Sequence, residues 1–407
     1  MIVTMLLSTA LAAAATTPAA DAPLAVERLV FATGPKAAQP SVAVDPREGF
    51  VVTWQERDGE DSALRYAVIA RDGAELRRGT VSSGPDRFVN GADFPSLAVL
   101  DNGDWVTYWL QKTAKGTYAY EIRMVRSRDA GRSWDAPIVP HRDGTPTEHG
   151  FVSMVPAGDD RVRVVWLDGR RMAASADAHG EGGDEHMTLR AAVIGRDGQA
   201  TDEHELDELT CACCQTDMVR GDSATLAAYR DRTGDELRDV AVLAHAKGAW
   251  SAPALAHADG WKMPACPVNG PALARQGDRY AVVWPTMASG EMQVMYASGR
   301  DASFGKAVEL AAGPGELGRV DAGTWGGEHL LVSRIATDAG VPALWLSEHD
   351  RAGRTVAATK VASPVGGYPR LAHHDAVTLL AWTEPVSGSA GATRVGIARI
   401  TARRAAD

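Results

Sequence analysis

The residues best suited to acid–base, ligand-binding or metal chemistry gather between Cys211 and Asp239. This stretch holds three of the four cysteines, together with alternating arginines and carboxylates between apolar segments. Guanidinium groups pair bidentately with carboxylates, and thiols either form disulfides or bind soft metals. The stretch therefore suggests a site for an anionic ligand. The alternative is a salt-bridged hairpin end that contributes little to stability.

Further polar residues follow apolar strands in the same register and extend this candidate site. Asp168 and Arg170 come directly after one such strand, although an Asp-Gly turn would explain them without any function. Carboxylates beside arginines have tunable pKa values, so the candidates for acid–base catalysis are Asp168, Asp231 and Glu236. The candidates for binding an anionic ligand are Arg170, Arg230, Arg238, Asn269, Arg319 and Arg370.

The cysteines allow two interpretations, because four of them permit three pairings. Cys266 precedes the repeat that follows the Cys211–Cys214 cluster, so a disulfide between the two is sterically reasonable. We expect disulfides, with the candidates Cys211, Cys213, Cys214 and Cys266. The alternative is a soft-metal site for copper or zinc, assisted by Met187, Met263 or a histidine. Because Cys-x-Cys-Cys differs from the Cys-x-x-Cys of common zinc sites, we predict no bound metal and no cofactor.

Length and charge narrow the possible partners. The chain has 407 residues, of which 45% are hydrophobic, so it can bury a large core. Its net charge of −10 argues against a surface for nucleic acid, and an anionic ligand would need a local cluster of arginines. We therefore predict no nucleic-acid partner. No feature of the sequence specifies an oligomeric state.

The beginning of the chain is typical of a secretory signal. Ile2–Ala15 is apolar and alanine-rich, small residues follow it, and no later run is long enough to span a bilayer. We predict a signal peptide over residues 1–22 and a single domain over residues 23–407. The protein is expected to be periplasmic or secreted, without a membrane span, which also favours disulfides.

A recurring pattern of short strands predicts the fold. Each unit has an alternating strand, a second strand that ends in an aromatic residue, and two more strands. The markers recur at intervals of about 50 to 60 residues. The aromatic ones are Trp54, Trp109, Trp166, Tyr229, Trp284 and Trp382, and a weaker copy between the last two ends at Ser333-Arg334. This period predicts an all-β propeller of four-stranded blades. The repeat count is seven, or six if Val320–Ala362 is not a full blade, and Ala25–Phe31 is expected to complete the last blade.

Strand direction predicts where the polar clusters lie. Consecutive strands of a blade run in opposite directions, so the start of the first strand and the turn between the second and third strands share one face. The cysteines, Asp168–Arg170 and Tyr229–Arg238 all fall on these segments. We therefore expect the candidate residues to gather on one face of the propeller.

One turn motif resembles a known family. Ser127-Arg-Asp129-Ala-Gly131-Arg-Ser133-Trp134 matches the Asp-box pattern Ser-x-Asp-x-Gly-x-Thr-Trp except for Ser133, and looser copies lie at residues 248–253 and 298–305. The chain thus resembles the sialidase (BNR-repeat) superfamily and its exported bacterial sialidase-like members over roughly residues 30–400. Family members bind the substrate carboxylate with three arginines and use a tyrosine nucleophile assisted by a glutamate, with an aspartate as acid/base.

This resemblance implies specific roles for residues of the chain. Arg230 resembles one arginine of the triad, and Tyr368 is the better exposed candidate for the nucleophile, because Tyr229 replaces a core tryptophan. The Phe-Arg-Ile-Pro motif of the family is absent, and Ala38-Gln39-Pro40-Ser41 stands in its place.

Two functions follow. The first is an exported sialidase-like exo-glycosidase, a hydrolase acting on an anionic sugar such as sialic acid through its arginine- and carboxylate-lined face. The alternative is a non-catalytic propeller that binds a glycan, a protein partner or a soft metal through the same face. A Tyr–Glu pair that meets convergent arginines would favour the enzyme.

Overall fold

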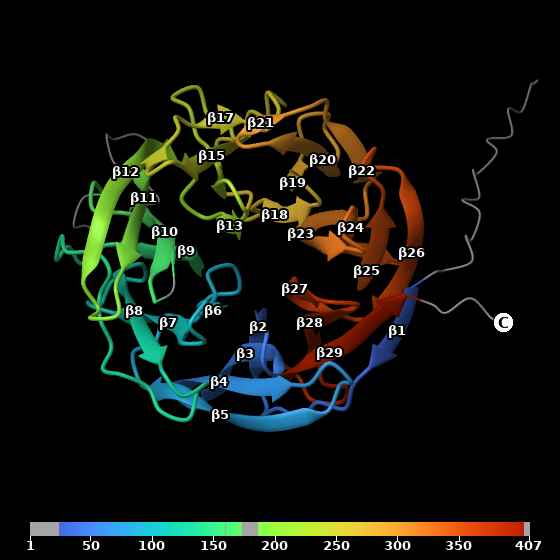
Figure 1. Cartoon of the computed structure of the whole chain (residues 1–407). Coiled ribbons are helices and arrows are strands. Elements are labelled where there is room, and N and C mark those ends of the chain that lie inside the picture. The colour runs from blue at the N-terminus through green and yellow to red at the C-terminus, as the bar shows by residue number, and fades with distance from the viewer. Residues whose placement is uncertain (1–23, 159, 173–185, 403–407) are drawn as a thin grey trace, which may run out of the picture.

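The protein is a seven-bladed β-propeller (Figure 1). The computed structural model describes residues 24–158, 160–172 and 186–402, and every regular element in these residues is a strand. Seven antiparallel sheets surround a central axis, which confirms the repeat count of seven rather than six. Within the described residues, no helix is long and apolar enough to cross a bilayer. The predicted signal peptide and part of the insertion that follows Arg170 lie outside the described residues.

The blades follow one another along the chain, each starting near the axis. The first blade contains β2 (Ala37–Asp45), β3 (Gly49–Asp58), β4 (Asp61–Ile69) and β5 (Glu75–Gly84). The second contains β6 (Leu97–Val99), β7 (Trp105–Lys112) and β8 (Tyr120–Ser127), with a single bridge from Met124 to Ile138 in the fourth position. The third contains β9 (His149–Pro156), β10 (Val162–Asp168), β11 (Met187–Ile194) and β12 (Ala200–Thr210).

The remaining blades vary in their outer strands. The fourth blade contains β13 (Asp217–Arg220), β14 (Thr225–Arg230), β15 (Val240–Ala246), β16 (Ala249–Trp250) and β17 (Ala254–Leu255). The fifth contains β18 (Ala272–Gln276), β19 (Arg279–Thr286), β20 (Gln293–Arg300), β21 (Ser303–Phe304) and β22 (Val308–Ala312). The sixth contains β23 (Glu316–Trp325), β24 (His329–Asp338), β25 (Val341–His349) and β26 (Thr355–Ala362). The seventh contains β27 (Gly366–His374), β28 (Val377–Pro385), β29 (Thr393–Ala402) and β1 (Leu24–Arg28).

Buried aromatic residues on the second strands fill the space between neighbouring blades. These strands are continuous apolar runs because both of their faces are covered. Four markers, on β3, β10, β19 and β28, are at most 2% exposed, namely Trp54, Trp166, Trp284 and Trp382. The indole of Trp54 donates to Glu56 at 2.8 Å, that of Trp166 to Asp168 at 2.7 Å, and that of Trp382 to Glu384 at 2.9 Å. An acid two residues after the tryptophan is therefore a repeated structural device of this fold.

The turn that resembles an Asp-box is held by its own side chains. Ser127 Oγ accepts the amide of Gly131 at 2.7 Å, and Asp129 Oδ1 accepts the amide of Ser133 at 2.8 Å. Trp134 packs edge-on against Tyr66 of the first blade, with ring centroids 6.3 Å apart. The turn after β8 therefore stabilises the contact between the first two blades.

The ring closes where the first described strand joins the last. β1 pairs antiparallel with β29, with Leu24 opposite Ala402 and Arg28 opposite Ala398. This confirms that the N-terminal strand completes the seventh blade, although the strand begins at Leu24 and ends at Arg28. Arg28 also forms a bidentate pair with Glu384, with both N–O distances 2.8 Å.

Removal of β1 should destabilise the whole propeller. A chain that starts at residue 29 loses the β1–β29 hydrogen bonds and the burial of Leu24, so we expect a loss of about 2 kcal/mol or more in the free energy of unfolding. Thermal unfolding followed by circular dichroism should still show one transition, at a lower temperature. A chain that starts at Leu24 is the matched control. Equal melting temperatures for the two chains would contradict closure by β1.

Candidate functional site

A cavity of about 710 Å³ opens at one face, between the second, third and fourth blades. Its walls come from the segments that precede the first strands of these blades and of the fifth blade, and from the turns between their second and third strands. This is the face that the strand-direction argument predicted. The ionisable and thiol groups in its wall include Asp93, Tyr120, Glu148, Cys213, Arg232, Glu236, Arg238 and Cys266.

Strained backbone supports this wall. Phe151, Glu236 and Val268 all line the cavity, and their φ angles are 52°, 64° and 56°. Residues with a side chain rarely adopt such positive values, and a β-branched valine does so at an energetic cost. Strain of this kind persists only where the surrounding structure enforces it, and it gathers at functional sites.

A tyrosine held between two carboxyl groups forms one side of the cavity. The hydroxyl of Tyr120, at the start of β8, lies 2.9 Å from Asp93 Oδ2 and 2.6 Å from Glu148 Oε1. Phe88 stacks on the Tyr120 ring with centroids 4.0 Å apart, which fixes its orientation. The amide of Phe151 donates to Asp93 Oδ1 at 2.8 Å. A side chain at Gly150 would collide with Asp93, since a Cβ there would lie 1.9 Å from Oδ2, so glycine is required.

The arrangement requires a shared proton. A phenol has one proton and can donate it to one carboxylate only, so the second short contact needs a protonated carboxyl group. Burial is the main cause that raises the pKa of Asp93 to about 7 and that of Glu148 to about 8. Burial also raises the pKa of Tyr120 well above its ordinary value. At neutral pH the group therefore holds a protonated Glu148, a neutral phenol and an Asp93 that is close to its titration point.

Two arginines and one glutamate form the fourth-blade side of the cavity. Glu236 Oε2 lies 2.6 Å from Arg238, and Glu236 Oε1 contacts Arg232 at 2.5 Å. Burial opposes ionisation of Glu236, but the hydrogen bonds and charges of the two arginines leave its pKa lowered. One carboxylate thus balances two guanidinium groups. Taken together, these three side chains carry one net positive charge, which suits an anionic ligand.

The four cysteines are free thiols, of which Cys213 and Cys266 line the cavity and Cys211 and Cys214 are buried. Cys211 Sγ lies 3.8 Å from Cys213 Sγ and 3.5 Å from Cys214 Sγ, and Cys266 interacts with Cys213. A disulfide needs a sulfur–sulfur distance of about 2.05 Å, so the expected disulfides are not formed. Hydrogen bonds from Cys213 and Cys214, followed by the charge of Arg238, hold the pKa of Cys211 well below its usual range despite its burial.

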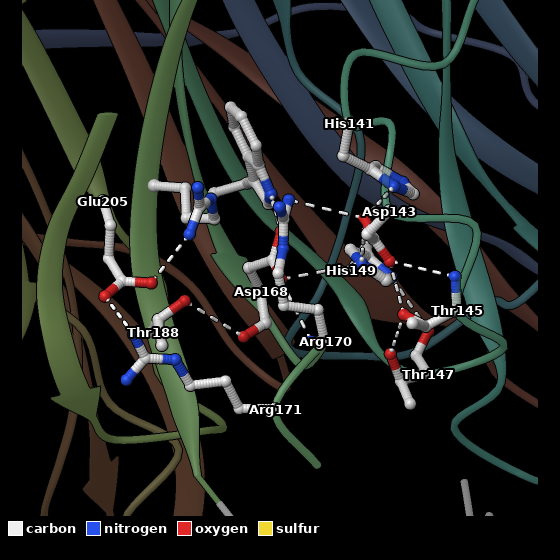
Figure 2. A network of polar contacts seen from close by, with 12 residues as sticks. His141, Asp143, Thr145, Thr147, His149, Asp168, Arg170, Arg171, Thr188 and Glu205 are labelled. Carbon is white, nitrogen blue, oxygen red and sulfur yellow. Dashed lines mark hydrogen bonds and ion pairs between the residues drawn. The ribbon is translucent and has the colours of Figure 1, made fainter. Parts of the chain in front are cut away.

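Asp168 and Arg170 belong to a buried polar network beside the cavity (Figure 2). Arg170 donates to both oxygens of Asp168 at 2.8 Å, and His149 Nε2 lies 3.7 Å from Asp168 and 3.2 Å from Asp143. The ring of His141 stacks on that of His149 at 3.8 Å. Burial lowers the pKa of His149, but its two carboxylate neighbours raise it overall. This network anchors the start of β9, next to Glu148, and its positive charges already balance its carboxylates.

The guanidinium group of Arg230 binds backbone carbonyl groups of the protein itself. It donates to the carbonyl oxygens of Asn269 at 2.8 and 3.0 Å, of Arg238 at 2.6 Å and of Pro285 at 2.8 Å. The residue is 1% exposed and lies over the ring of Trp261. Arg230 therefore ties the fourth blade to the fifth, and its planar fork is already occupied.

The other predicted residues are placed apart from the cavity wall. Tyr368 is buried and its hydroxyl donates to the carbonyl of Val268, while Arg319 lies over the Tyr368 ring. Arg370 is half-buried near the axis, 3.6 Å from Asp321. Asp231 ends up half-buried beyond β14, where burial raises its pKa to about 6. Of the predicted catalytic and ligand-binding residues, the structure brings Glu236 and Arg238 into the cavity wall.

Sequence reasoning missed Asp93, Tyr120, Glu148 and Arg232. Asp93 and Glu148 precede the first strands of the second and third blades, as Cys213 precedes that of the fourth. Tyr120 follows the turn between a second and a third strand. Strand direction alone places all four on the cavity face. In the sequence they are less conspicuous than the arginine-rich stretch after β14, whose local charge density is higher.

Comparison with solved structures finds a protein with a similar fold. No protein-family model and no curated protein matches the chain. A solved protein of unknown function from Dyadobacter fermentans has 14% identity and a TM-score of 0.55, covering 94% of this chain and all of its own. The α-L-arabinanase of Penicillium chrysogenum has 13% identity and a TM-score of 0.48, covering 90% and 93% of the two chains. NanB sialidase of Streptococcus pneumoniae has 9% identity and a TM-score of 0.41, covering 93% and 94%.

The buried carboxyl groups should make stability depend on pH. Folded Glu148 keeps its proton up to about pH 8, whereas the unfolded chain releases it near 4.5, so stability should fall as pH rises between these values. The Glu148→Gln variant cannot ionise and should lose less stability between about pH 5 and pH 8, by a few kcal/mol. Urea unfolding midpoints at the two pH values measure this. Glu236→Gln, at a site whose pKa is lowered, is the control and should keep the wild-type fall.

Proposed function

We propose that the protein is a glycoside hydrolase that acts on an anionic sugar in the cavity between its second, third and fourth blades. Tyr120 is the nucleophile, Asp93 is the base that activates it, and Glu148 is the general acid. Arg238 and Arg232 bind the carboxylate of the sugar. The single observation that carries this proposal is the Tyr120 hydroxyl held within hydrogen-bond distance of two buried carboxyl groups.

The roles follow from how the environment separates the two carboxyl groups. Glu148 has the higher pKa, about 8, so it is protonated at neutral pH and can donate to a leaving group. Asp93 has a pKa of about 7 and is oriented by the amide of Phe151, so it can take the phenol proton. A neutral phenol approaches an anionic sugar without the charge repulsion that a carboxylate nucleophile would meet.

The reaction has two balanced steps. In the first, Tyr120 Oη attacks the anomeric carbon and passes its proton to Asp93, while Glu148 protonates the departing glycosidic oxygen. In the second, water attacks the same carbon and gives a proton to Glu148, while Asp93 returns a proton to the departing Tyr120 oxygen. The sugar is released with retained configuration, and each side chain regains its starting protonation state.

The charge pattern supports an anionic substrate. Arg232 and Arg238 share Glu236, which leaves a net positive charge on the fourth-blade side of the cavity. Two guanidinium groups, of which that of Arg238 is buried and that of Arg232 partly exposed, can hold a carboxylate through charge-assisted hydrogen bonds. A volume of about 710 Å³ falls in the range of small-molecule sites. The export of the protein, its sialic acid specificity and its exo mode of action belong to the same proposal.

Loss of the Tyr120 hydroxyl should abolish turnover. The Tyr120→Phe variant keeps the ring and its stacking on Phe88 but has no nucleophile, so release of fluorophore from aryl glycosides of sialic and uronic acids should fall by about 1,000-fold or more. Tyr108→Phe is the matched control, because the Tyr108 hydroxyl donates to the backbone carbonyl of Phe94 and takes no part in the mechanism. Turnover that survives in Tyr120→Phe would refute the assigned nucleophile.

Removal of Arg238 should weaken binding of an anionic sugar. A ligand carboxylate left without its partner costs about 2–5 kcal/mol, so Arg238→Ala should raise the dissociation constant about 30-fold or more. Arg238→Lys should also bind poorly, because an ammonium lacks the planar fork. Arg275→Ala, which removes an exposed ion pair with Asp222, is the control for charge. Calorimetry with free sialic and uronic acids tests this, and equal affinity in wild type and Arg238→Ala would contradict it.

A further inference from the structure

The three clustered sulfur atoms stand at distances typical of metal ligands. The Sγ atoms of Cys211, Cys213 and Cys214 all lie within 4.8 Å of one another. A metal–sulfur bond of about 2.3 Å in tetrahedral geometry places two sulfur ligands about 3.8 Å apart. The Cys211–Cys213 and Cys211–Cys214 distances are 3.8 and 3.5 Å. The cluster is therefore close to the geometry that a bound metal would require.

The cysteine loop is anchored to three other parts of the propeller. Gln215, directly after Cys214, donates to the carbonyl of Ala92 at 2.6 Å and accepts the amide of Gly270 at 3.0 Å. Thr216 donates to the carbonyl of Phe151 at 2.6 Å. These contacts tie the loop to the second, fifth and third blades. The thiols are thus held together by the scaffold, which lowers the cost of ordering them around an ion.

The surroundings of the cluster favour a soft ion bound by thiolates. Thioether groups of Met172 and Met187 line the same cavity, and thiolates with thioethers select Cu(I) over harder ions. Glu236, the carboxylate on the fourth-blade side of the cavity, is already shared by two arginines.

The cavity provides the route by which an ion reaches the cluster. Cys211 and Cys214 are each 1% exposed, whereas Cys213 and Cys266 line the cavity. Cys266 comes from the segment before the fifth blade and interacts with Cys213. An ion that enters the cavity therefore meets two accessible thiols before it reaches the two buried ones.

We propose that Cys211, Cys213 and Cys214, with Cys266 as a fourth donor at the cavity wall, form a binding site for one Cu(I) ion. None of its ligands is among the proposed catalytic residues Asp93, Tyr120 and Glu148, and Arg238 lies beside both the cysteine cluster and the proposed sugar carboxylate. The two sites open into the same cavity, so an occupied copper site would border the sugar.

Titration of the reduced protein with Cu(I) under anaerobic conditions tests the proposal. Competition with a chromophoric Cu(I) chelator should reveal one tightly bound ion per chain, and X-ray absorption should report sulfur neighbours at about 2.3 Å. Cys213→Ser should weaken binding about 100-fold or more. Ala212→Ser, which adds a hydroxyl to the same loop and removes no thiol, should bind as the wild type does. Because metal binding is measured directly, the result does not depend on turnover.

A second measurement on the wild type guards against variants that fail to fold. Alkylation followed by mass spectrometry should find the thiols reactive in the apo protein and protected when Cu(I) is bound. Undiminished Cu(I) binding by Cys213→Ser would overturn the proposal. So would protein that carries two disulfides and takes up no Cu(I) after reduction. Zn(II) that displaces stoichiometric Cu(I) from the site would overturn the choice of metal.

Discussion

The antiparallel pairing of β1 with β29 is the constraint on which the rest of the molecule depends. A propeller blade has a free edge, and closure by strands from both ends of the described chain ties the first blade to the last. Once the ring is closed, the first strands all begin at the same end of the axis. Loops that are far apart in sequence are then forced together there. The cavity is a direct consequence, because its wall comes from four successive blades.

The cavity contains carboxyl groups on one side and arginines on the other, and the net charge of each side is reduced by its neighbours. Two buried carboxyl groups would repel an anionic ligand, but their raised pKa values and the shared phenol proton reduce the negative charge of that side to about one. The arginine pair on the fourth blade keeps one net positive charge, since Glu236 balances only half of it. Cys211 and Cys266 lie close to Arg238, and Cys266 also contributes to the raised pKa of Glu148. The cavity is therefore polarised from one blade to the next.

The fold could be predicted from the sequence because it rests on a repeated pattern. The buried tryptophans mark the second strand of most blades, and strand direction places the functional segments on one face. The site was predicted only in part, since burial and the contacts of a side chain cannot be read from local charge. Arg230 looks like a ligand-binding arginine in sequence, yet backbone carbonyls saturate its guanidinium group. Glu148 lies in an ordinary polar turn, and only the fold brings it to Tyr120.

The fourth blade lacks the tryptophan–acid hydrogen bond that recurs in other blades, and its loop is free to take another role. In the first, third and seventh blades, the acid two residues after the marker tryptophan accepts its indole, as Asp168 does from Trp166. In the fourth blade the marker is Tyr229, whose hydroxyl bonds Asp207 instead, so Asp231 receives no indole hydrogen bond. The loop that follows no longer has to hold a tryptophan in place. It carries the arginine pair into the cavity, directly beside the cysteine cluster. The blade that lacks this hydrogen bond is therefore also the blade whose loop forms the wall on which both proposed ligands would bind.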